Sequence, residues 1–248
     1  MIPIRDHNPS GRTPYVTYAL IAVNVVIFLG YWPLFSDPRA INAFFDGWAM
    51  IPVRVSAQGD YAGLVTSMFL HGSVMHLGGN MLFLWIFGDN VEEEMGHVPF
   101  LLFYLAAGIG AGIVHVLSSP ASLVPTVGAS GAIAAVMGSY LLLFPRAKVD
   151  IFLFFVFFLR ILPIPAWIML GIWFALQLVN GVGSDPSAGG VAYWAHAGGF
   201  VIGIGATLPL FLRLGGQRFW ARTDGHPPHP EADYRIGRSR IPVVKRRK

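Results

Sequence analysis

The chain has 248 residues, 54% of them hydrophobic and 12% charged, against roughly 25% charged residues in a soluble domain. This excludes an ordinary water-soluble domain and favours a chain solvated by lipid, while the lack of cysteine excludes disulfides, thiolate nucleophiles and cysteine-ligated metals. The net charge of +4 rests on one end of the chain, since ten of the 17 Lys and Arg lie in residues 213–248. A tail against anionic lipid headgroups explains this better than binding of nucleic acid.

Residues 1–14 are polar and Pro-rich, and the apolar run after them is too long for a signal peptide. Residues 35–75 are expected to form an outer loop lying partly in the membrane interface. Residues 151–162 are apolar but too few to span a bilayer, so we assign them to the connection between the fourth and fifth helices. The sequence therefore predicts an all-α membrane protein with six spans: Tyr15–Leu34, His76–Asp89 with an extension towards Glu94, Val98–Leu117, Ser130–Phe144, Pro165–Val179 and Tyr193–Leu214.

The distribution of basic residues orients this bundle. With an inside N-terminus, 15 of the 17 Lys and Arg fall in the inside segments, which are 1–14, 90–97, 145–164 and 213–248. This positive-inside bias predicts that both termini face the cytoplasm. We therefore expect three parts: a cytoplasmic N-terminal segment (1–14), a membrane domain (15–214) and a basic, disordered cytoplasmic tail (215–248).

The fourth predicted helix is too short for a bilayer. Its 15 residues cover about 22 Å, against roughly 30 Å of hydrocarbon. The preceding residues 118–129 are rich in Ser, Pro and Gly and are not expected to be helical. Irregular backbone at membrane depth is tolerated where it lines a watery cavity. The sequence thus predicts a cavity that opens outward, with Ser130 near its floor.

Ser130 stands at a helix start, where unpaired N–H groups and the helix dipole favour a developing negative charge. His196 lies about one turn into the sixth helix, on the same side and at a similar depth, and a neutral imidazole there can accept a serine proton. Ser130 as a simple N-cap and His196 as a packing residue are the alternatives. No membrane Asp or Glu is placed to orient His196, so the pattern predicts a Ser–His dyad and not a triad.

Small residues recur at every fourth position on two of the predicted helices: Ser130, Ala134 and Gly138 on the fourth, Gly199 and Gly203 on the sixth. Such faces let membrane helices approach closely. They are also common in ordinary helix packing. This spacing therefore indicates proximity of the two helices and says nothing about catalysis.

A second polar cluster stands at the entry to the second helix. His76 and Asn80 are four residues apart and share one helical face, and such side chains can donate to an oxyanion. A metal site built from His71, His76 and His196 is the alternative, but the five-residue spacing of the first two suits one face poorly and no carboxylate lies near. His115 has no evident partner and is expected to be structural. Three further histidines, His97, His226 and His229, are expected to be cytoplasmic and inert.

Three motifs occur in order: His71-Gly-Ser-Val-Met-His76-Leu-Gly-Gly-Asn80-Met, then Gly128-Ala-Ser130-Gly131, then Ala195-His196-Ala-Gly-Gly199-Phe-Val-Ile-Gly203. Together they resemble the rhomboid family of intramembrane serine proteases, of the bacterial six-helix type. The resemblance covers about Leu70 to Leu214, and the helix count extends it to the first helix.

The resemblance implies that Ser130 is the nucleophile and His196 the general base. The Ser130 N–H, His76 and Asn80 would form the oxyanion hole, with His71, Gly128 and Gly131 in supporting roles. The implied reaction hydrolyses peptide bonds in or near transmembrane segments of single-pass membrane proteins and needs no metal or nucleotide cofactor. The implied location is a bacterial inner membrane.

Two positions depart from the family pattern. Some members have an aromatic residue one turn after the serine, where it stacks on the histidine, and this chain has Ala134. A Trp-Arg pair is frequent in the first outer loop, and here Ala49 follows Trp48. Two other functions compete with a protease: a non-catalytic relative that binds transmembrane helices, and a transporter or channel, although paired repeats typical of transporters are not found.

Overall fold

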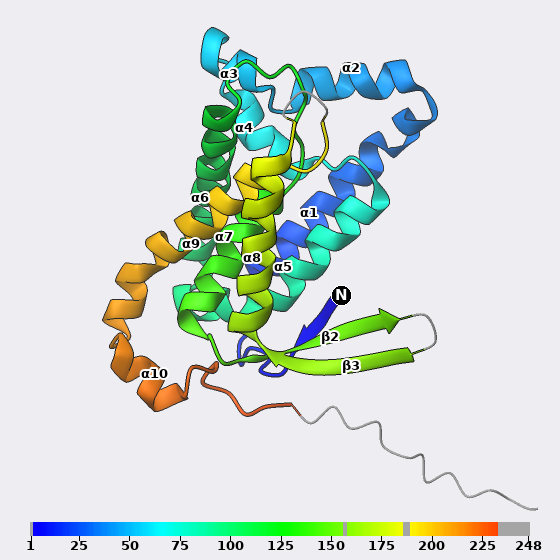
Figure 1. Cartoon of the computed structure of the whole chain (residues 1–248). Helices are drawn as coiled ribbons and strands as arrows, with labels where there is room; N and C mark the ends of the chain where they lie inside the picture. Colours follow the sequence, from blue (N-terminus) through cyan, green and yellow to red (C-terminus); the bar gives the residue numbers. More distant parts are fainter. Residues whose placement is uncertain (1, 156–157, 186–188, 233–248) are drawn as a thin grey trace, which may run out of the picture.

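A computed structural model describes residues 2–155, 158–185 and 189–232, and shows a helical bundle with a small sheet at one end (Figure 1). Each of the six predicted helices has a counterpart, with bounds that differ by at most a few residues. These are α1 (Tyr15–Tyr31), α5 (Val74–Met95), α6 (His97–Ser118), α7 (Ser130–Leu143), α8 (Ala166–Gly183) and α9 (Tyr193–Arg213).

Four of the described helical segments are long and apolar enough to cross a membrane, namely Tyr15–Ser36, His97–Ser118, Ala166–Gly183 and Tyr193–Arg213. Helix α7 is apolar but shorter, with 14 residues, or about 21 Å. Helix α5 has 22 residues and ends in an acidic run. The predicted helical membrane bundle with a short fourth helix is confirmed, while the number of spans stays a prediction.

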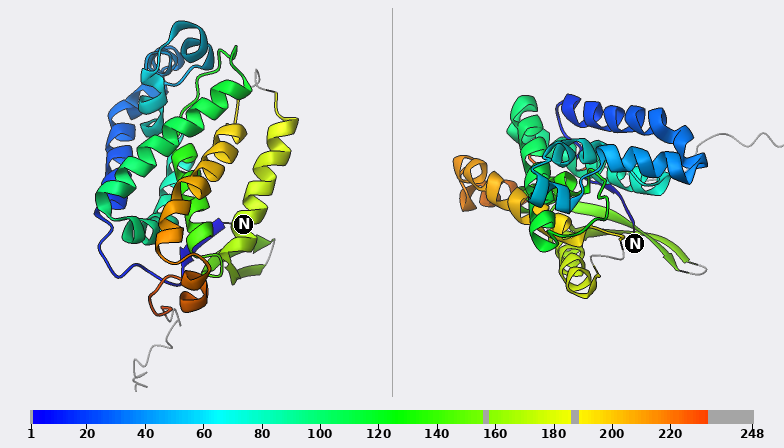
Figure 2. Two further views of the ribbon diagram at one scale, coloured as in Figure 1. Left: turned by 90° about the vertical axis from the view of Figure 1, so that its left-hand side faces the viewer. Right: turned by 90° about the horizontal axis from the view of Figure 1, so that it is seen from above.

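Helix α7 lies at the centre of the bundle and contacts α5, α6, α8 and α9 (Figure 2). Every residue from Ala132 to Tyr140 is buried. A helix surrounded by other helices can be apolar on all sides, which explains why its sequence shows no polar face. Its shortness leaves room beyond its N-terminus, and the irregular segment 119–129 occupies that end.

Helices α7 and α9 pack closely, backbone against backbone, as the small-residue spacing predicts. A Cβ added at Gly203 would collide with the carbonyl of Ala135, and one at Gly199 with the carbonyl of Gly131. The face of α7 that meets α9 therefore includes Gly131 and Ala135 as well as Gly138, whose added Cβ would strike the carbonyl of Phe200.

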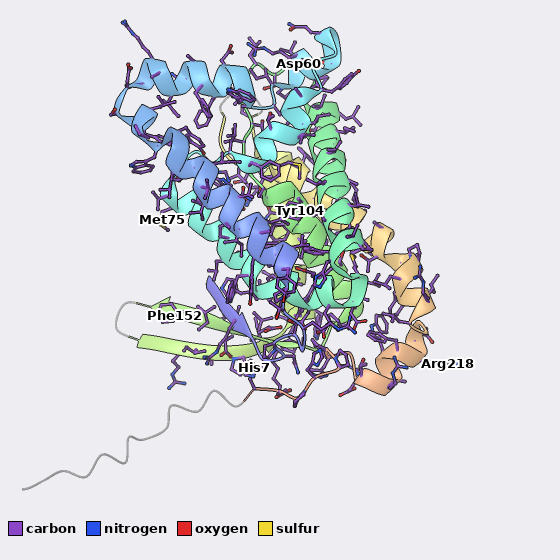
Figure 3. The ribbon with its side chains drawn as sticks, turned by 180° about the vertical axis from the view of Figure 1, so that it is seen from behind. His7, Asp60, Met75, Tyr104, Phe152 and Arg218 are labelled. Atoms are coloured by element: carbon purple, nitrogen blue, oxygen red, sulfur yellow. The ribbon has the colours of Figure 1, made fainter. Side chains whose placement is uncertain are left out.

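The outer loop between α1 and α5 folds into short helices. They are the 3-10 turns η1 (Trp32–Ser36) and η2 (Ser67–Phe69), and α2 (Pro38–Trp48), α3 (Pro52–Gln58) and α4 (Ala62–Thr66). Tyr31 anchors them, because its ring stacks on Phe44 and its hydroxyl bonds the backbone of His71. Asp60, between α3 and α4, marks this end of the molecule, and His7 and Arg218 lie towards the opposite end (Figure 3).

The three strands were not predicted. Strands β1 (Ile2–Asp6), β2 (Lys148–Phe155) and β3 (Phe158–Pro165) form an antiparallel sheet in the order β1-β2-β3, at the end of the bundle opposite α2 and α3 (Figure 1). The apolar run 151–162, assigned to a connection, is therefore a hairpin. Its aromatic and β-branched residues favour strands, and β1, far away in sequence, supplies the third strand.

The tail is partly ordered, which corrects the expectation of disorder over 215–248. Helix α10 spans Gln217–Thr223, and the following residues lie against the sheet end: His229 Nε2 is 2.6 Å from Glu93 Oε2, and Lys148 Nζ is 2.9 Å from Glu231 Oε2. Composition alone missed this order because the partners come from distant elements. Residues 233–248 lie outside the described residues.

Candidate active site

The structure brings Ser130 and His196 into contact. Ser130 is the first residue of α7, and His196 lies in the first turn of α9. The Nε2 atom of His196 is 2.7 Å from the Oγ of Ser130. The glycine contacts between α7 and α9 explain this, because two helices that touch backbone to backbone carry their first turns together.

Gly128 shapes the backbone before the serine. It has φ of +135° and donates its N–H to the Ser67 carbonyl at 2.9 Å. A Cβ built on it would lie 2.8 Å from His76 Nε2 and 3.4 Å from Ser130 Oγ. Both the positive φ and the lack of space require glycine here. His76 and Ser130 thus flank the same glycine, and the first N–H groups of α7 have no partner within the helix.

His76 and Asn80 present donors on this side of α5. His76 Nδ1 accepts the N–H of Gly72 at 3.3 Å, so a neutral ring carries its hydrogen on Nε2, the atom beside Gly128. The Nδ2 of Asn80 is buried and has no hydrogen-bond acceptor among the described residues. These are two donors of the kind that an oxyanion requires.

His71 lies beside His76 and is not among the residues that line the cavity around Ser130. Its side chain is fully buried, and its ring stands edge-on to that of His76 with centroids 5.1 Å apart. Its backbone N–H and carbonyl both bond the hydroxyl of Tyr31. These contacts give His71 a place that supports the position of His76.

A cavity of about 570 Å³ joins these groups, and its lining includes His76, Asn80, Gly128, Ser130 and His196. The other walls come from α4, α6 and the segments on either side of Ser130 and before α9. A neighbouring cavity of about 520 Å³ is lined by His115, Tyr193 and Trp194 among others. His115 has a partner that the sequence did not suggest, since its Nε2 lies 3.2 Å from Thr126 Oγ1. Among the described residues no group of three His, Asp or Glu side chains is arranged to hold a metal ion.

The sequence prediction missed two residues beside His196, both on α8. Gln177 Oε1 is 2.9 Å from His196 Nδ1. The ring of Trp173 lies 5.9 Å from the imidazole, tilted by 30°. The aromatic neighbour of His196 therefore comes from α8, and not from the position on α7 that Ala134 occupies in this chain. Gln177 carried a signal, because a lone amide within an apolar stretch is costly unless it has a partner. Gln177 is neither Asp nor Glu, the two residue types expected to orient His196.

Comparison with known proteins indicates the same family as the sequence motifs. Residues 58–213 match the Rhomboid domain family. The chain is similar to the mitochondrial Rhomboid protein 1 of Saccharomyces cerevisiae, with 31% identity over 199 residues that cover 76% of this chain and 51% of that protein. It is similar to the Rhomboid protease GluP of Bacillus subtilis, with 45% identity over 85 residues, 34% of this chain and 16% of that protein.

The human Presenilin-associated rhomboid-like protein, mitochondrial, is 29% identical over 134 residues, 53% of this chain and 34% of that protein. The chain thus spans about half the length, or less, of these curated relatives.

Proposed function

Since the chain belongs to the rhomboid family, we propose that it is an intramembrane serine endopeptidase whose nucleophile is Ser130 and whose general base is His196. Its apolar helices and its family make it an integral membrane protein. The observation that carries the proposal is the 2.7 Å contact between Ser130 Oγ and His196 Nε2 in a cavity that also holds His76 and Asn80.

The geometry supports acyl transfer in two halves. Ser130 Oγ attacks the carbonyl carbon of the scissile bond while its proton passes to His196 Nε2. The resulting oxyanion accepts hydrogen bonds from the Ser130 N–H, His76 Nε2 and Asn80 Nδ2. The imidazolium then gives its proton to the leaving amine, and the C–N bond breaks. In the second half a water attacks the carbonyl carbon of the acyl ester while His196 Nε2 takes one proton from that water. The ester C–O bond then breaks, the carboxylic acid product leaves, and His196 gives that proton to Ser130 Oγ.

The proposed substrates are single-pass membrane proteins, cut in or near their transmembrane segments. Short α7 and the irregular segment before it support this, because they hold the cavity at the end of an apolar bundle. An extended stretch of backbone is needed to reach Ser130. Helices that unwind easily near small residues provide one.

The proposed orientation has the termini in the cytoplasm and the cavity facing outward. The N-terminal strand β1 and helix α10 lie at one end of the molecule. Helix α3 lies at the other end, together with α4, which lines the cavity (Figure 1). The positive-inside bias supports this. The proposal divides the chain into a membrane domain (15–214) with cytoplasmic flanks. A bacterial inner membrane stays a prediction.

Replacement of the serine tests the proposal. We expect purified Ser130→Ala in detergent or liposomes to cleave a model transmembrane substrate at least 1,000-fold more slowly than wild type, because no nucleophile remains. Ser56→Ala, which removes an exposed hydroxyl on α3, should keep wild-type activity. Labelling with a fluorophosphonate should map to Ser130. Equal cleavage by Ser130→Ala and wild type would refute the assignment and leave a helix-binding, non-catalytic relative as the better reading.

A further inference from the structure

Gln177 is a buried amide in an otherwise lipid-compatible helix. Its side chain is 8% exposed, while other side chains of α8, such as Leu176, Val179 and Val182, face outward. A carboxamide costs free energy in such surroundings unless its hydrogen bonds are made. Both polar atoms of the Gln177 side chain have hydrogen-bond partners. These partners determine how the amide group is oriented.

The first partner decides which way the amide points. Gln177 Nε2 donates to the carbonyl of Trp173, one turn earlier, at 3.2 Å. A carbonyl only accepts, so the NH₂ group must be on that side. Oε1 therefore faces His196 Nδ1 at 2.9 Å, and the reverse orientation would set two acceptors against each other.

The second partner decides the tautomer of the histidine. Since Oε1 can only accept, His196 Nδ1 must carry the hydrogen, and the neutral ring then has a lone pair on Nε2. That is the nitrogen 2.7 Å from Ser130 Oγ. The opposite tautomer would place N–H against the serine, where it could not take the proton. The hydrogen bonds therefore have a single possible direction. Gln177 donates to the Trp173 carbonyl, His196 Nδ1 donates to Gln177 Oε1, and Ser130 Oγ donates to His196 Nε2.

The amide also ties the base to one helix. Helix α8 packs on α9 through Trp173 and Phe174, whose rings lie 5.9 Å and 4.8 Å from that of Phe200, and α8 lies at the edge of the bundle (Figure 2). Withdrawal of α8 by about 1 Å would lengthen the 2.9 Å contact beyond hydrogen-bond range.

We propose that Gln177 is a positioning residue for the general base: it holds His196 in the tautomer that accepts the serine proton, and only while α8 is seated against α9. This inference rests on the proposed function for its kinetic consequence. The tautomer itself does not depend on activity. A carboxylate in this place would need a charge in a largely apolar helix, which an amide avoids.

The test uses Gln177→Leu, Gln177→Glu and the control Asn180→Leu, which removes an exposed amide from the same helix. We expect Gln177→Leu to lower kcat about 10- to 100-fold, as loss of a hydrogen bond to a charged imidazolium does, with KM changed less than about twofold. Gln177→Glu restores an acceptor and should recover activity, with the acidic limb of its pH–rate profile moved upward by about one pH unit. Asn180→Leu should match wild type.

A second measurement does not require turnover. Nitrogen-15 histidine spectra of the full chain in detergent, with His196 assigned by its loss in His196→Asn, should show hydrogen on Nδ1 in wild type and a mixture of tautomers in Gln177→Leu. Wild-type kcat and an unchanged tautomer in Gln177→Leu would overturn the inference. If wild type cleaves nothing and the tautomer still changes, the proposed function fails and the role of Gln177 stands.

Discussion

Two side chains of α5, His76 and Asn80, present hydrogen-bond donors in the cavity that holds Ser130. His76 is oriented by the Gly72 N–H on its Nδ1, and Asn80 Nδ2 is buried without an acceptor among the described residues. A buried donor without a partner costs about 1–3 kcal/mol. Asn80 lines the cavity, where a developing oxyanion would supply an acceptor for its Nδ2.

Loss of these donors is expected to act on the chemical step. His76→Ala and Asn80→Ala should each lower kcat about 100- to 1,000-fold, the usual loss for one oxyanion donor, with a smaller effect on KM. Gly79→Ala, on the same helix and with open space around its Cβ position, serves as the control. Steady-state cleavage of a transmembrane substrate measures this, and unchanged kcat in both variants would remove the oxyanion hole from this position.

At the residue scale, the proximity of Ser130 and His196 was predictable from the sequence, while their catalytic roles stay a prediction. A histidine in a membrane segment is costly to keep, a serine at a helix start has unpaired N–H groups beside it, and the structure places the two side chains 2.7 Å apart. The contacts of Gln177 and Trp173 with His196 were not predicted, because they depend on how α8 is rotated against α9. No local pattern specifies that rotation.

At the scale of elements, the seam between α7 and α9 decides whether the two site residues meet. Gly203→Ala forces a methyl group onto the backbone of Ala135. Overpacking of this kind costs about 1–3 kcal/mol, so the apparent melting temperature in detergent should fall by several degrees and activity should fall with it. Gly205→Ala lies on the same helix with open space at its Cβ.

That control should melt at or slightly above the wild-type temperature, because alanine favours a helix. Equal melting of Gly203→Ala and Gly205→Ala would show that the close approach contributes nothing.

Element boundaries were predictable because apolar length and small-residue spacing are local properties. The hairpin of β2 and β3 was not, since about a dozen apolar residues read equally well as a buried connection. Its strands pair with each other in register from Lys148 and Pro165 to Phe155 and Phe158, and β1 from the start of the chain covers one edge. That third strand lies about 145 residues away in sequence, beyond the reach of any local pattern.

Across the whole molecule, the sheet end contains buried acids that make stability depend on pH. Burial, followed by the nearby Asp89 carboxylate, raises the pKa of Asp6 from 3.8 to about 7, although Tyr140 and Asn90 donate to it. The folded chain therefore holds a proton that the unfolded chain has lost above pH 4. Stability from this group is fully present below about pH 4 and is lost as the pH rises to about 7.

Melting curves between pH 4 and 8 check this. Asp6→Asn should flatten the decline, since its amide needs no proton, and the exposed Asp60→Asn should not. Asp150 has the opposite effect on the pH dependence of stability. Burial would raise its pKa, but hydrogen bonds from His7 and Arg5 hold that pKa below 3.8. Its contribution to stability therefore changes below pH 4, outside the tested range. A decline that persists unchanged in Asp6→Asn would assign the pH dependence to another group.

The position of Gln177 has a pharmacological consequence. The seam between Phe174 and Phe200 is apolar on both sides, and neighbouring α8 side chains such as Leu176 are exposed at the edge of the bundle. A small hydrophobic compound dissolved in the bilayer could enter there and wedge the two helices apart. By the proposed role of Gln177, such a compound would stop the proposed proteolysis without occupying the cavity or reacting with Ser130, and added substrate would not displace it. Inhibitors of this chain can therefore be sought from the lipid side.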